Sequence, residues 1–358
     1  MTDIGLVVFT GNEKIIAAKK EGHVKSLVRR AFLKTGKLLH RCGFYKTAFG
    51  TWLFYLSHKK YFSQPNELVK VSDNLEFQII RLPLNIEELS GFNGTYLEKL
   101  VNRNIAVNNI KYCHIPSTVK DRGFFKNFDS CPNYEGLLLK LLLDPIVANI
   151  YSKRADRIGD LEILFLAGED RAETYEAIRL LEPQIRYVTV AAGNKEEVES
   201  ETENIFGDSG LSISVVGDYK SALKHADLIL NFDKELPFLS KIKLKPQAIV
   251  FNLADADLTG AFSEKTVIYG LVPDLPKELT SRLGMRIMQY YTRRELASLL
   301  IARLSGLSEE YPFTYDSSLK VKTDFGHYGF RIAGLKGKYG VLRLDALQKY
   351  AAGPAPGN

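Results

Sequence analysis

Short apolar segments alternate with amphipathic segments through the middle of the chain. The apolar segments cover residues 161–167, 186–192, 211–216, 227–231, 248–253 and 266–271. The segments between several of them, at 171–182, 195–206 and 219–225, have the spacing of helices. Continuous apolar strands separated by helices are typical of a parallel sheet that is covered on both faces. With right-handed crossovers, the pattern predicts an α/β fold with a doubly wound parallel, Rossmann-like sheet.

The pattern on either side of this region is less regular. It predicts strands at 4–9, 77–81 and 105–112, a strand leading into a loop over 44–57, and helices at 20–42, 86–102, 134–154 and 285–305. The pair Asp144-Pro145 is expected to kink the helix at 134–154, because proline removes a backbone donor.

These elements suggest a division of the chain into domains. We expect a second α/β domain over residues 1–133, completed by a closing helix near 285–305. The Rossmann-like domain then covers 134–284, and residues 285–358 form the closing helix and a C-terminal tail.

Composition places the chain among ordinary globular proteins. Of its 358 residues, 45% are hydrophobic and 25% are charged. Its three cysteines have no CxxC spacing, which argues against a structural zinc site and fits a reducing compartment. The sequence contains no run of eighteen apolar residues, so it predicts no transmembrane helix. We therefore expect a cytoplasmic protein.

Positive charge is concentrated at the start of the chain. Residues 1–66 contain twelve Lys/Arg and three Asp/Glu, a net charge of +9, whereas the rest carries −3. Such a segment can meet an acidic carrier protein, an anionic membrane surface or nucleic acid, the last being the least favoured. A solvated face of an ordinary packed helix explains the same charges.

The turn after the first strand of the predicted sheet is where a dinucleotide would place its pyrophosphate. Only Gly168 remains there of a G-x-G-x-x-G arrangement, with Asp170 and Glu173 near the positions of the later glycines. Each carboxylate would oppose a phosphate, and Arg171 can compensate for one of them. The fold is therefore better supported than the cofactor.

Other polar residues end the strands of this sheet, where a ligand crevice is expected. Asn194 and Lys195 follow the second strand and can face a 2′-phosphate, although the start of a solvated helix explains them equally well. Asn231 and Asn252 end two later strands. These residues, with Gly168, make NADP the expected cofactor, with the absence of any cofactor as the alternative.

The order of helices and strands around the predicted sheet resembles that of one protein family over much of the chain. The stretches that carry the likeness are Arg29–Lys37, Gly43–Phe54, Asn104–Asn109 and Glu295–Leu300. They are similar in layout to the acyl-carrier-protein reductases that make fatty aldehydes and to their relatives called predicted amino-acid dehydrogenases. The resemblance implies an NAD(P)H-dependent reductase of an acyl or aminoacyl thioester, with an acidic acyl carrier protein as partner. The family's acylated cysteine falls near Glu295, where this chain has none.

Cys131 is the candidate for a replacement nucleophile. It precedes the helix that leads into the sheet, and a helix N-terminus favours a thiolate. A small buried core residue is the more common fate of a lone cysteine. Three functions follow: a thioester reductase, a catalytically inactive Rossmann-like binding protein, and a protein that uses its basic start on nucleic acid or a membrane surface.

Overall fold

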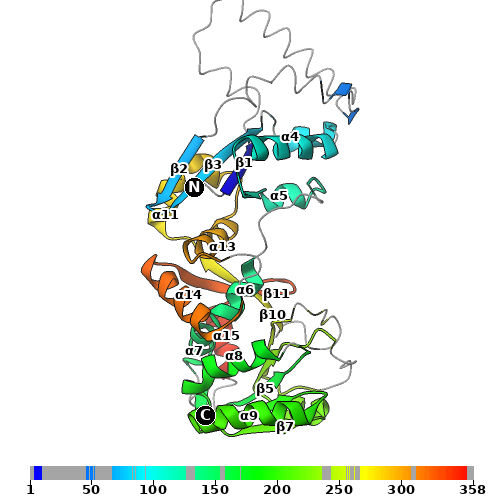
Figure 1. The fold of residues 1–358 in the computed structure, drawn as a ribbon, viewed down its shortest axis with the longest axis vertical. Coiled ribbons are helices and arrows are strands. Elements are labelled where there is room, and N and C mark those ends of the chain that lie inside the picture. Colours follow the sequence, from blue (N-terminus) through cyan, green and yellow to red (C-terminus); the bar gives the residue numbers. More distant parts are fainter. Residues whose placement is uncertain are drawn as a thin grey trace, which may run out of the picture. The chain divides into compact units, whose positions relative to one another are not determined.

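The structure is a computed structural model, and it divides into two compact units that are described separately (Figure 1). Unit 1 comprises residues 1–132 and 277–296, and unit 2 comprises 133–276 and 297–358. The domain boundaries expected from the sequence concern independent folding and stay a prediction. The structure describes residues 4–9, 46–47, 49–50, 52, 67–82, 84, 86–92, 94–125, 134–153, 158–169, 171–235, 243–254, 256, 258, 262, 267–307 and 312–352.

Unit 1 is built on a small sheet. Over its described residues, four strands follow the order β2-β3-β1-β4, with β1 parallel to β3 and β4, and β2 antiparallel to β3. Its elements are β1 (Ile4–Phe9), β2 (Glu67–Ser72), β3 (Leu75–Leu82), η2 (Ile86–Gly91), α4 (Gly94–Val107), β4 (Tyr112–His114), α5 (Ser117–Lys120), α11 (Lys277–Leu283), α12 (Met285–Met288) and the start of α13 (Arg293–Leu304).

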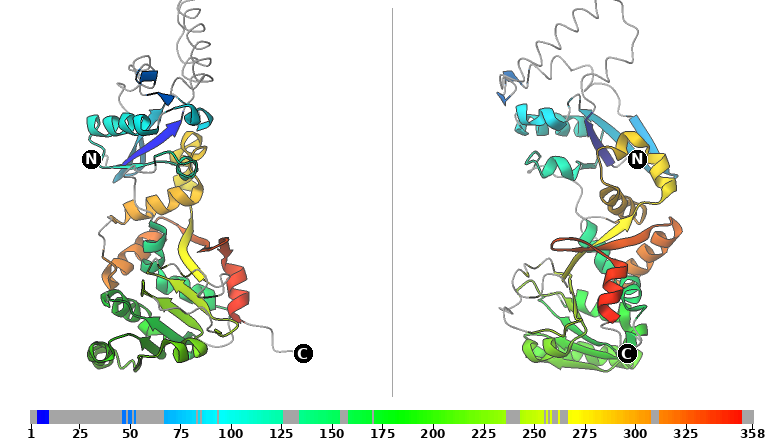
Figure 2. Two further views of the ribbon diagram at one scale, coloured as in Figure 1. Left: turned by 90° about the vertical axis from the view of Figure 1, so that its right-hand side faces the viewer. Right: turned by 180° about the vertical axis from the view of Figure 1, so that it is seen from behind.

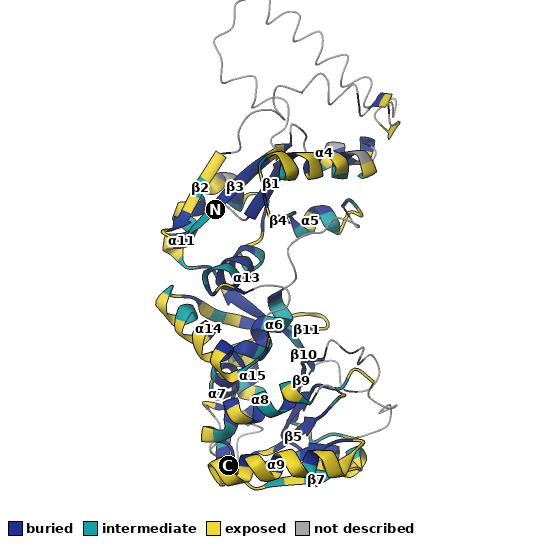
Figure 3. Cartoon of the chain, in the orientation of Figure 1, coloured by how far each residue is buried: buried dark blue, intermediate teal, exposed yellow. Residues whose placement is uncertain are grey.

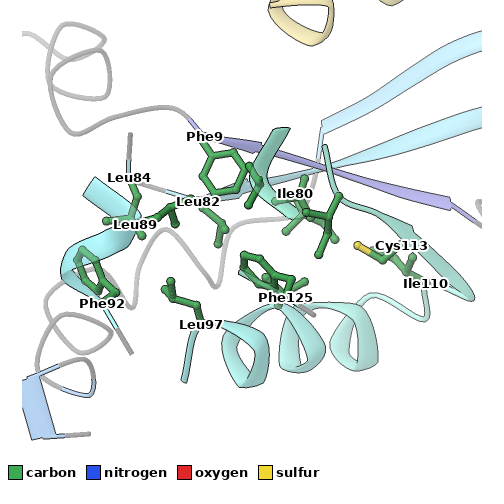
Figure 4. Close-up of a cluster of buried hydrophobic side chains, with 14 residues drawn as sticks. Phe9, Ile80, Leu82, Leu84, Leu89, Phe92, Leu97, Ile110, Cys113 and Phe125 are labelled. Carbon is green, nitrogen blue, oxygen red and sulfur yellow. The ribbon is translucent and has the colours of Figure 1, made fainter. Parts of the chain in front are cut away.

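The core of unit 1 lies between this sheet and α4. Phe9, Ile80 and Leu82 project from the strands toward Leu97 of α4 and toward Phe125 (Figure 4). All five side chains are buried. This core fixes the carboxyl ends of β1, β3 and β4 along one edge of the sheet, since the three strands are parallel.

Two predictions for unit 1 are wrong. The strand expected at 105–112 is instead the end of α4, because Leu97, Val101 and Ile105 recur every four residues and lie on its core side. Within 44–57, the described residues Phe49 and Trp52 are helical, and their rings stack. The strand expected at 4–9 is confirmed, and the basic helix expected at 20–42 lies outside the described residues.

Unit 2 contains the larger sheet. Its elements are α6 (Tyr134–Leu141), α7 (Leu143–Tyr151), η3 (Ile158–Asp160), β5 (Glu162–Leu166), α8 (Ala172–Leu181), η4 (Glu182–Gln184), β6 (Tyr187–Ala191), α9 (Lys195–Ser209), β7 (Ile213–Val216), α10 (Tyr219–His225), β8 (Leu228–Asn231), β9 (Ile249–Asn252), β10 (Val267–Asp274), the rest of α13, α14 (Tyr315–His327), β11 (Arg331–Gly337), β12 (Gly340–Arg343) and α15 (Leu344–Ala352).

The order of these strands confirms the predicted fold class. The described part of unit 2 forms an eight-stranded sheet of order β12-β11-β10-β9-β8-β5-β6-β7 (Figure 2). From β5 to β10 the strands are parallel and run in the order third, second, first, fourth, fifth, sixth. This is the order of the doubly wound dinucleotide-binding fold, and its switch point lies between β5 and β8.

Both faces of this sheet are covered, as continuous apolar strands require. Leu164, Ile229 and Val250 face one side and pack with Leu223 of α10. The alternate residues of the same strands, such as Phe165, are equally buried and face the other side. The central strands of the sheet are dark in the burial view, whereas the outer side of α9 is exposed (Figure 3). The buried strands thus hold their carboxyl ends in a fixed row.

The helix expected at 134–154 is broken near the predicted kink. It forms α6 and α7, with Leu142 between them and Pro145 in the first turn of α7. Proline suits that position because its missing N–H would have no helical partner. The closing helix expected at 285–305 is also interrupted, since α12 ends at Met288 and α13 begins at Arg293.

The segment after residue 308, which the pattern treats as a tail, contains regular structure. It holds α14, the hairpin of β11 and β12, and α15. β11 pairs antiparallel with β10 and so extends the sheet. The hairpin was missed because its glycines interrupt the alternation of a strand: a Cβ on Gly334 would lie 2.7 Å from the Leu342 carbonyl oxygen.

Candidate functional site

The carboxyl ends of β5 and β8 meet at the switch point of the unit 2 sheet. The ladder between them continues past the strands, because the Phe232 amide donates to the Leu166 carbonyl at 2.9 Å. The chain then leaves β5 through Gly168 and enters α8 at Ala172. A ligand crevice in this fold is expected beside that turn.

Gly168 is required there by space. A Cβ at this position would lie 2.6 Å from the Phe232 carbonyl oxygen and 3.1 Å from the Asp233 Cα. Both neighbours belong to the backbone and cannot rotate away. By contrast, a Cβ on Gly193, which follows β6, would meet nothing within 4 Å. The close approach of the two loops therefore selects glycine at the first position of the reduced motif.

The start of α8 offers backbone donors. Its N-terminal residue Arg171 makes no side-chain capping bond to the helix. Thr174, in the first turn, is fully buried, and its hydroxyl has no hydrogen-bond partner among the described residues. Burial raises the pKa of the neighbouring Tyr175, so its hydroxyl stays protonated. A helix start with these properties can accept an anion.

Two charged residues beside this turn are paired. The Glu173 carboxylate lies 2.7 Å from Lys140 Nζ on α6, and this lysine is largely buried. Arg171 forms an ion pair with Glu197 in the first turn of α9. Glu173 is therefore neutralised by a lysine, and Arg171 is paired with an acid of the neighbouring helix. Asp170 itself lies outside the described residues.

Asn194 and Lys195 lie at the end of β6 as expected, where α9 begins. Asn194 is exposed and adopts an extended conformation before the helix. Lys195 pairs with Glu199 one turn along, at 3.1 Å, with both side chains about half exposed. Such a pair contributes little stability, so either partner can be recruited by a ligand at small cost.

Asn231 and Asn252 are brought together at the ends of β8 and β9. The Asn231 side-chain amide donates to Asn252 Oδ1 and to the Asp233 carbonyl, both at 3.1 Å, and its oxygen accepts from the Asp233 amide. Asn252 donates in turn to the Ala256 carbonyl at 2.7 Å. Both side chains are buried, and their amide groups donate to other groups of the same chain. They hold the chain segments that follow β8 and β9.

The predicted nucleophile, Cys131, lies outside the described residues. Of the other two cysteines, Cys113 is buried in β4, and Cys42 also lies outside the described residues. The described residues contain no group of three or more side chains suited to a metal ion. No described helix is both long and apolar enough to cross a bilayer.

Unit 1 has a polar cluster that the sequence did not reveal. His114 ends β4, and its Nε2 lies 3.0 Å from Glu295 Oε1 on α13. The same carboxylate accepts from the Ser117 amide at 2.8 Å and from the Ser117 hydroxyl at 3.3 Å. The His114 ring stacks on Tyr291, whose hydroxyl donates to the carbonyls of Val7 and His114, each at 2.8 Å.

Glu295 also begins α13 through a capping box. Its amide donates to Thr292 Oγ1 at 3.2 Å, and the Thr292 amide donates back to the Glu295 carboxylate at 3.4 Å. Burial alone would raise the pKa of Glu295. The hydrogen bond and charge of His114, with the amides of Ser117 and Thr292, outweigh burial and lower that pKa. The T-x-x-E pattern at 292–295 was the one available sequence signal.

This cluster joins β4, α5 and α13 within unit 1. Only about a tenth of the His114 and Glu295 side chains is exposed. The Glu295 carboxylate, which lies between His114, Ser117 and Thr292, links these residues and holds Ser117 in position. The arrangement is suited to holding the segment that follows β4 in place.

No protein-family model and no curated protein matches this chain. Among solved structures it is similar to Δ1-pyrroline-2-carboxylate reductase of Thermococcus litoralis in complex with NADH and L-proline, at 14% identity and a TM-score of 0.23, over 32% of this chain and 35% of that one. It is also similar to the malic enzyme of Entamoeba histolytica, at 11% identity and a TM-score of 0.28, over 76% and 64%.

A third similar structure is L-tryptophan dehydrogenase of Nostoc punctiforme. It is 11% identical, with a TM-score of 0.26, and the match covers 91% of this chain and 89% of that one. The chain thus spans about a third of the pyrroline-carboxylate reductase and just under two thirds of the malic enzyme. With TM-scores of 0.23 to 0.28, these three likenesses carry no argument about this chain.

Proposed function

We propose that unit 2 binds a nicotinamide dinucleotide beside the turn between β5 and α8, and that the protein is an oxidoreductase. The observation that carries the proposal is the strand order from β7 to β10, with Gly168 at its switch point packed against Phe232. A bound nicotinamide would supply hydride transfer. The chain's own part is to hold the cofactor's pyrophosphate and to shape the crevice.

The residues around the turn between β5 and α8 fit the pyrophosphate of such a cofactor in part. The uncapped start of α8 directs its dipole and amides toward the turn, as a pyrophosphate requires. Lys140 neutralises Glu173, which removes one of the two charges expected to oppose the phosphates. Asp170 remains as the charge that weakens binding.

The test is a calorimetric titration of the full chain with NADPH and NADH, before and after Asp170→Gly. We expect the substitution to tighten NADPH binding about tenfold, which corresponds to about 1.4 kcal/mol. Asp208→Gly makes the same change of charge at the far end of α9 and should leave the dissociation constant unchanged. If neither the parent chain nor the Asp170→Gly variant binds NADPH or NADH, the result would instead favour the alternative function, a Rossmann-like binding protein without a cofactor.

We further propose that NADPH is preferred over NADH. Arg171, Asn194 and Lys195 lie at the ends of two adjacent parallel strands, and the described residues that end β6 include no acid to bind a ribose diol. Glu197 competes with a 2′-phosphate for Arg171. Glu197→Gln should therefore tighten NADPH binding about threefold and leave NADH binding unchanged, whereas equal changes for both cofactors would contradict a 2′-phosphate site.

The finer proposal is that the substrate is an acyl or aminoacyl thioester delivered by an acidic carrier protein. It rests on the layout resemblance and on the basic residues 1–66. Cys131 would be the nucleophile, activated at the start of the following helix. Iodoacetamide should label Cys131 near neutral pH, and acyl-CoA should protect it, while buried Cys113 reacts only after unfolding. Labelling of Cys131 only in denaturant would remove it from the mechanism.

A further inference from the structure

The two edges of the unit 2 sheet carry charges of opposite sign. One edge is β7, which is covered by α9, and the other is β12. Helix α9 contains six acidic residues and one lysine. Between Asp324 and Asp345, around the hairpin of β11 and β12, there are four basic residues and no acidic one. Opposite charges at opposite edges cannot neutralise each other within one rigid sheet.

The acidic face of α9, defined here as Glu196, Glu203 and Phe206, is exposed. These residues are seven and three positions apart, so they lie on one side of the helix. Its two glutamates have no ion-pair partner in the part of the chain that the structure describes, whereas Glu197 on the same helix is paired with an arginine. Phe206 is 56% exposed, about one turn after Glu203. An aromatic side chain left in water among unpaired charges is typical of a contact surface.

The basic hairpin, defined here as residues 331–343, presents the complementary features. Tyr339 at its turn is 75% exposed, and Val341 on β12 is 50% exposed. Lys338 Nζ lies 5.8 Å from the centre of the Tyr339 ring. The largely exposed Arg343 side chain forms a surface ion pair with Asp345 at 3.1 Å, which contributes little and leaves Arg343 able to bind another acid. The outer side of β12 ends the sheet, so its backbone groups are not paired with another strand there.

The two strands of the hairpin pair closely. A Cβ on Gly334 would clash with the Leu342 carbonyl, and Gly340 at the turn has a φ of 135°, a conformation that favours glycine. The glycines therefore set the path of the backbone that presents Lys338 and Tyr339.

We infer that the basic hairpin docks on the acidic face of α9 of a second copy of this chain. Phe206 of one copy would meet Tyr339 and Val341 of the other, with Lys338 and Arg343 among the glutamates around them. This is the arrangement of an apolar centre within a charged rim. A second copy is the occupant because both halves of the complementary pair are present on every molecule.

This contact joins two different surfaces, so it is heterologous. Each added copy leaves one free hairpin and one free acidic face, and the assembly grows as a ring or a filament rather than stopping at a symmetric dimer. Its attraction is largely electrostatic and is therefore weakened by salt.

Sedimentation velocity of the full chain tests the inference. At about 50 mM salt, where charges are poorly screened, the weight-average sedimentation coefficient should rise with protein concentration. At about 500 mM salt it should fall to the value of a monomer. A monomer at every concentration in low salt would overturn the inference, as would association that salt does not weaken.

A charge exchange makes the test specific. The variant Lys338→Glu/Arg343→Glu and the variant Glu196→Lys/Glu203→Lys should each lose association, and mixing the two should restore it. Lys220→Glu/Lys224→Glu on α10 makes the same change of net charge as the hairpin variant and should associate normally. Failure of the mixture to associate, with both variants folded by thermal unfolding, would overturn the inference. If a hairpin variant does not fold, Tyr339→Ser, which changes one exposed side chain, should weaken association at least tenfold.

Discussion

Units 1 and 2 both place polar side chains at the carboxyl ends of parallel strands, but they use different chemistry there. Unit 1 joins a histidine and an ionised glutamate, His114 and Glu295. Unit 2 joins two neutral amides, Asn231 and Asn252. A buried charge requires a full set of donors around it, whereas a neutral amide pair adds no field of its own. The edge of unit 2 therefore leaves the electrostatics of its crevice to the start of α8.

The largest expected effect is the loss of the charged cluster in unit 1. Glu295→Ala leaves His114 and the Ser117 amide without their acceptor and removes the capping box of α13. Because a buried pair broken on one side is strongly destabilising, the free energy of unfolding should fall by about 4 kcal/mol. Denaturant unfolding measures it. Glu295→Gln retains an acceptor for Ser117 and should lose less than half as much.

In unit 2, the corresponding weak point is the turn rather than the amides. Gly168→Ala forces a Cβ against the Phe232 carbonyl and should cost about 2 kcal/mol of unfolding free energy. It should also weaken dinucleotide binding, because the turn must shift. Gly193→Ala, at the equivalent turn after β6, has open space and should stay within about 0.5 kcal/mol of the parent. Equal effects of the two substitutions would contradict the packing described for Gly168.

Removing the neutral pair should have a smaller effect. Asn231→Ala deletes three hydrogen bonds and leaves the Asp233 amide and Asn252 Oδ1 without that partner, at a cost of about 1.5 kcal/mol. Asn194→Ala changes an exposed amide at the end of β6 and serves as the control. Denaturant unfolding measures the free energy of unfolding of both variants. If Asn231→Ala lowered it more than Glu295→Ala does, the expected order of the two pairs would be wrong.

The smallest expected effect concerns the pH dependence of stability, which distinguishes the charged pair of His114 and Glu295 from the neutral pair of Asn231 and Asn252. The pKa of Glu295 is lowered in the folded chain, so its contribution is present above the unfolded value of 4.5 and is lost as pH falls through the lower folded value. The stability difference between the parent and Glu295→Gln should shrink over that acidic range. The Asn231→Ala difference should not follow it, because neither amide titrates.

The sequence predicts unit 2 better than unit 1 for a physical reason. The central strands β5, β8 and β9 are buried on both faces, and each therefore appears in the sequence as a continuous apolar run. In unit 1, β2 is exposed over much of its length and β4 spans only Tyr112–His114, so neither leaves such a run. The hairpin of β11 and β12 was missed for a related reason, its many glycines.

The candidate sites differ in the same way. Gly168, Asn231 and Asn252 were found because a doubly wound fold fixes where its strands end. The cluster of His114, Ser117 and Glu295 was missed because 178 positions separate the serine from the glutamate, and no local pattern joins them. Partners so far apart become visible only when the chain is folded.

The link between Tyr291 and β1 has a consequence for synthesis. The Tyr291 hydroxyl donates to the Val7 carbonyl, across 284 positions of sequence. At a translation rate of about 5–20 residues per second, β1 leaves the ribosome roughly 15–60 s before its partner on the α12–α13 segment exists. All of the parallel strands of unit 2 are made in that interval. Unit 1 therefore begins first but is completed only after the parallel strands of unit 2 have been made, and until then its apolar first strand has β3 and β4 as the partners already synthesised.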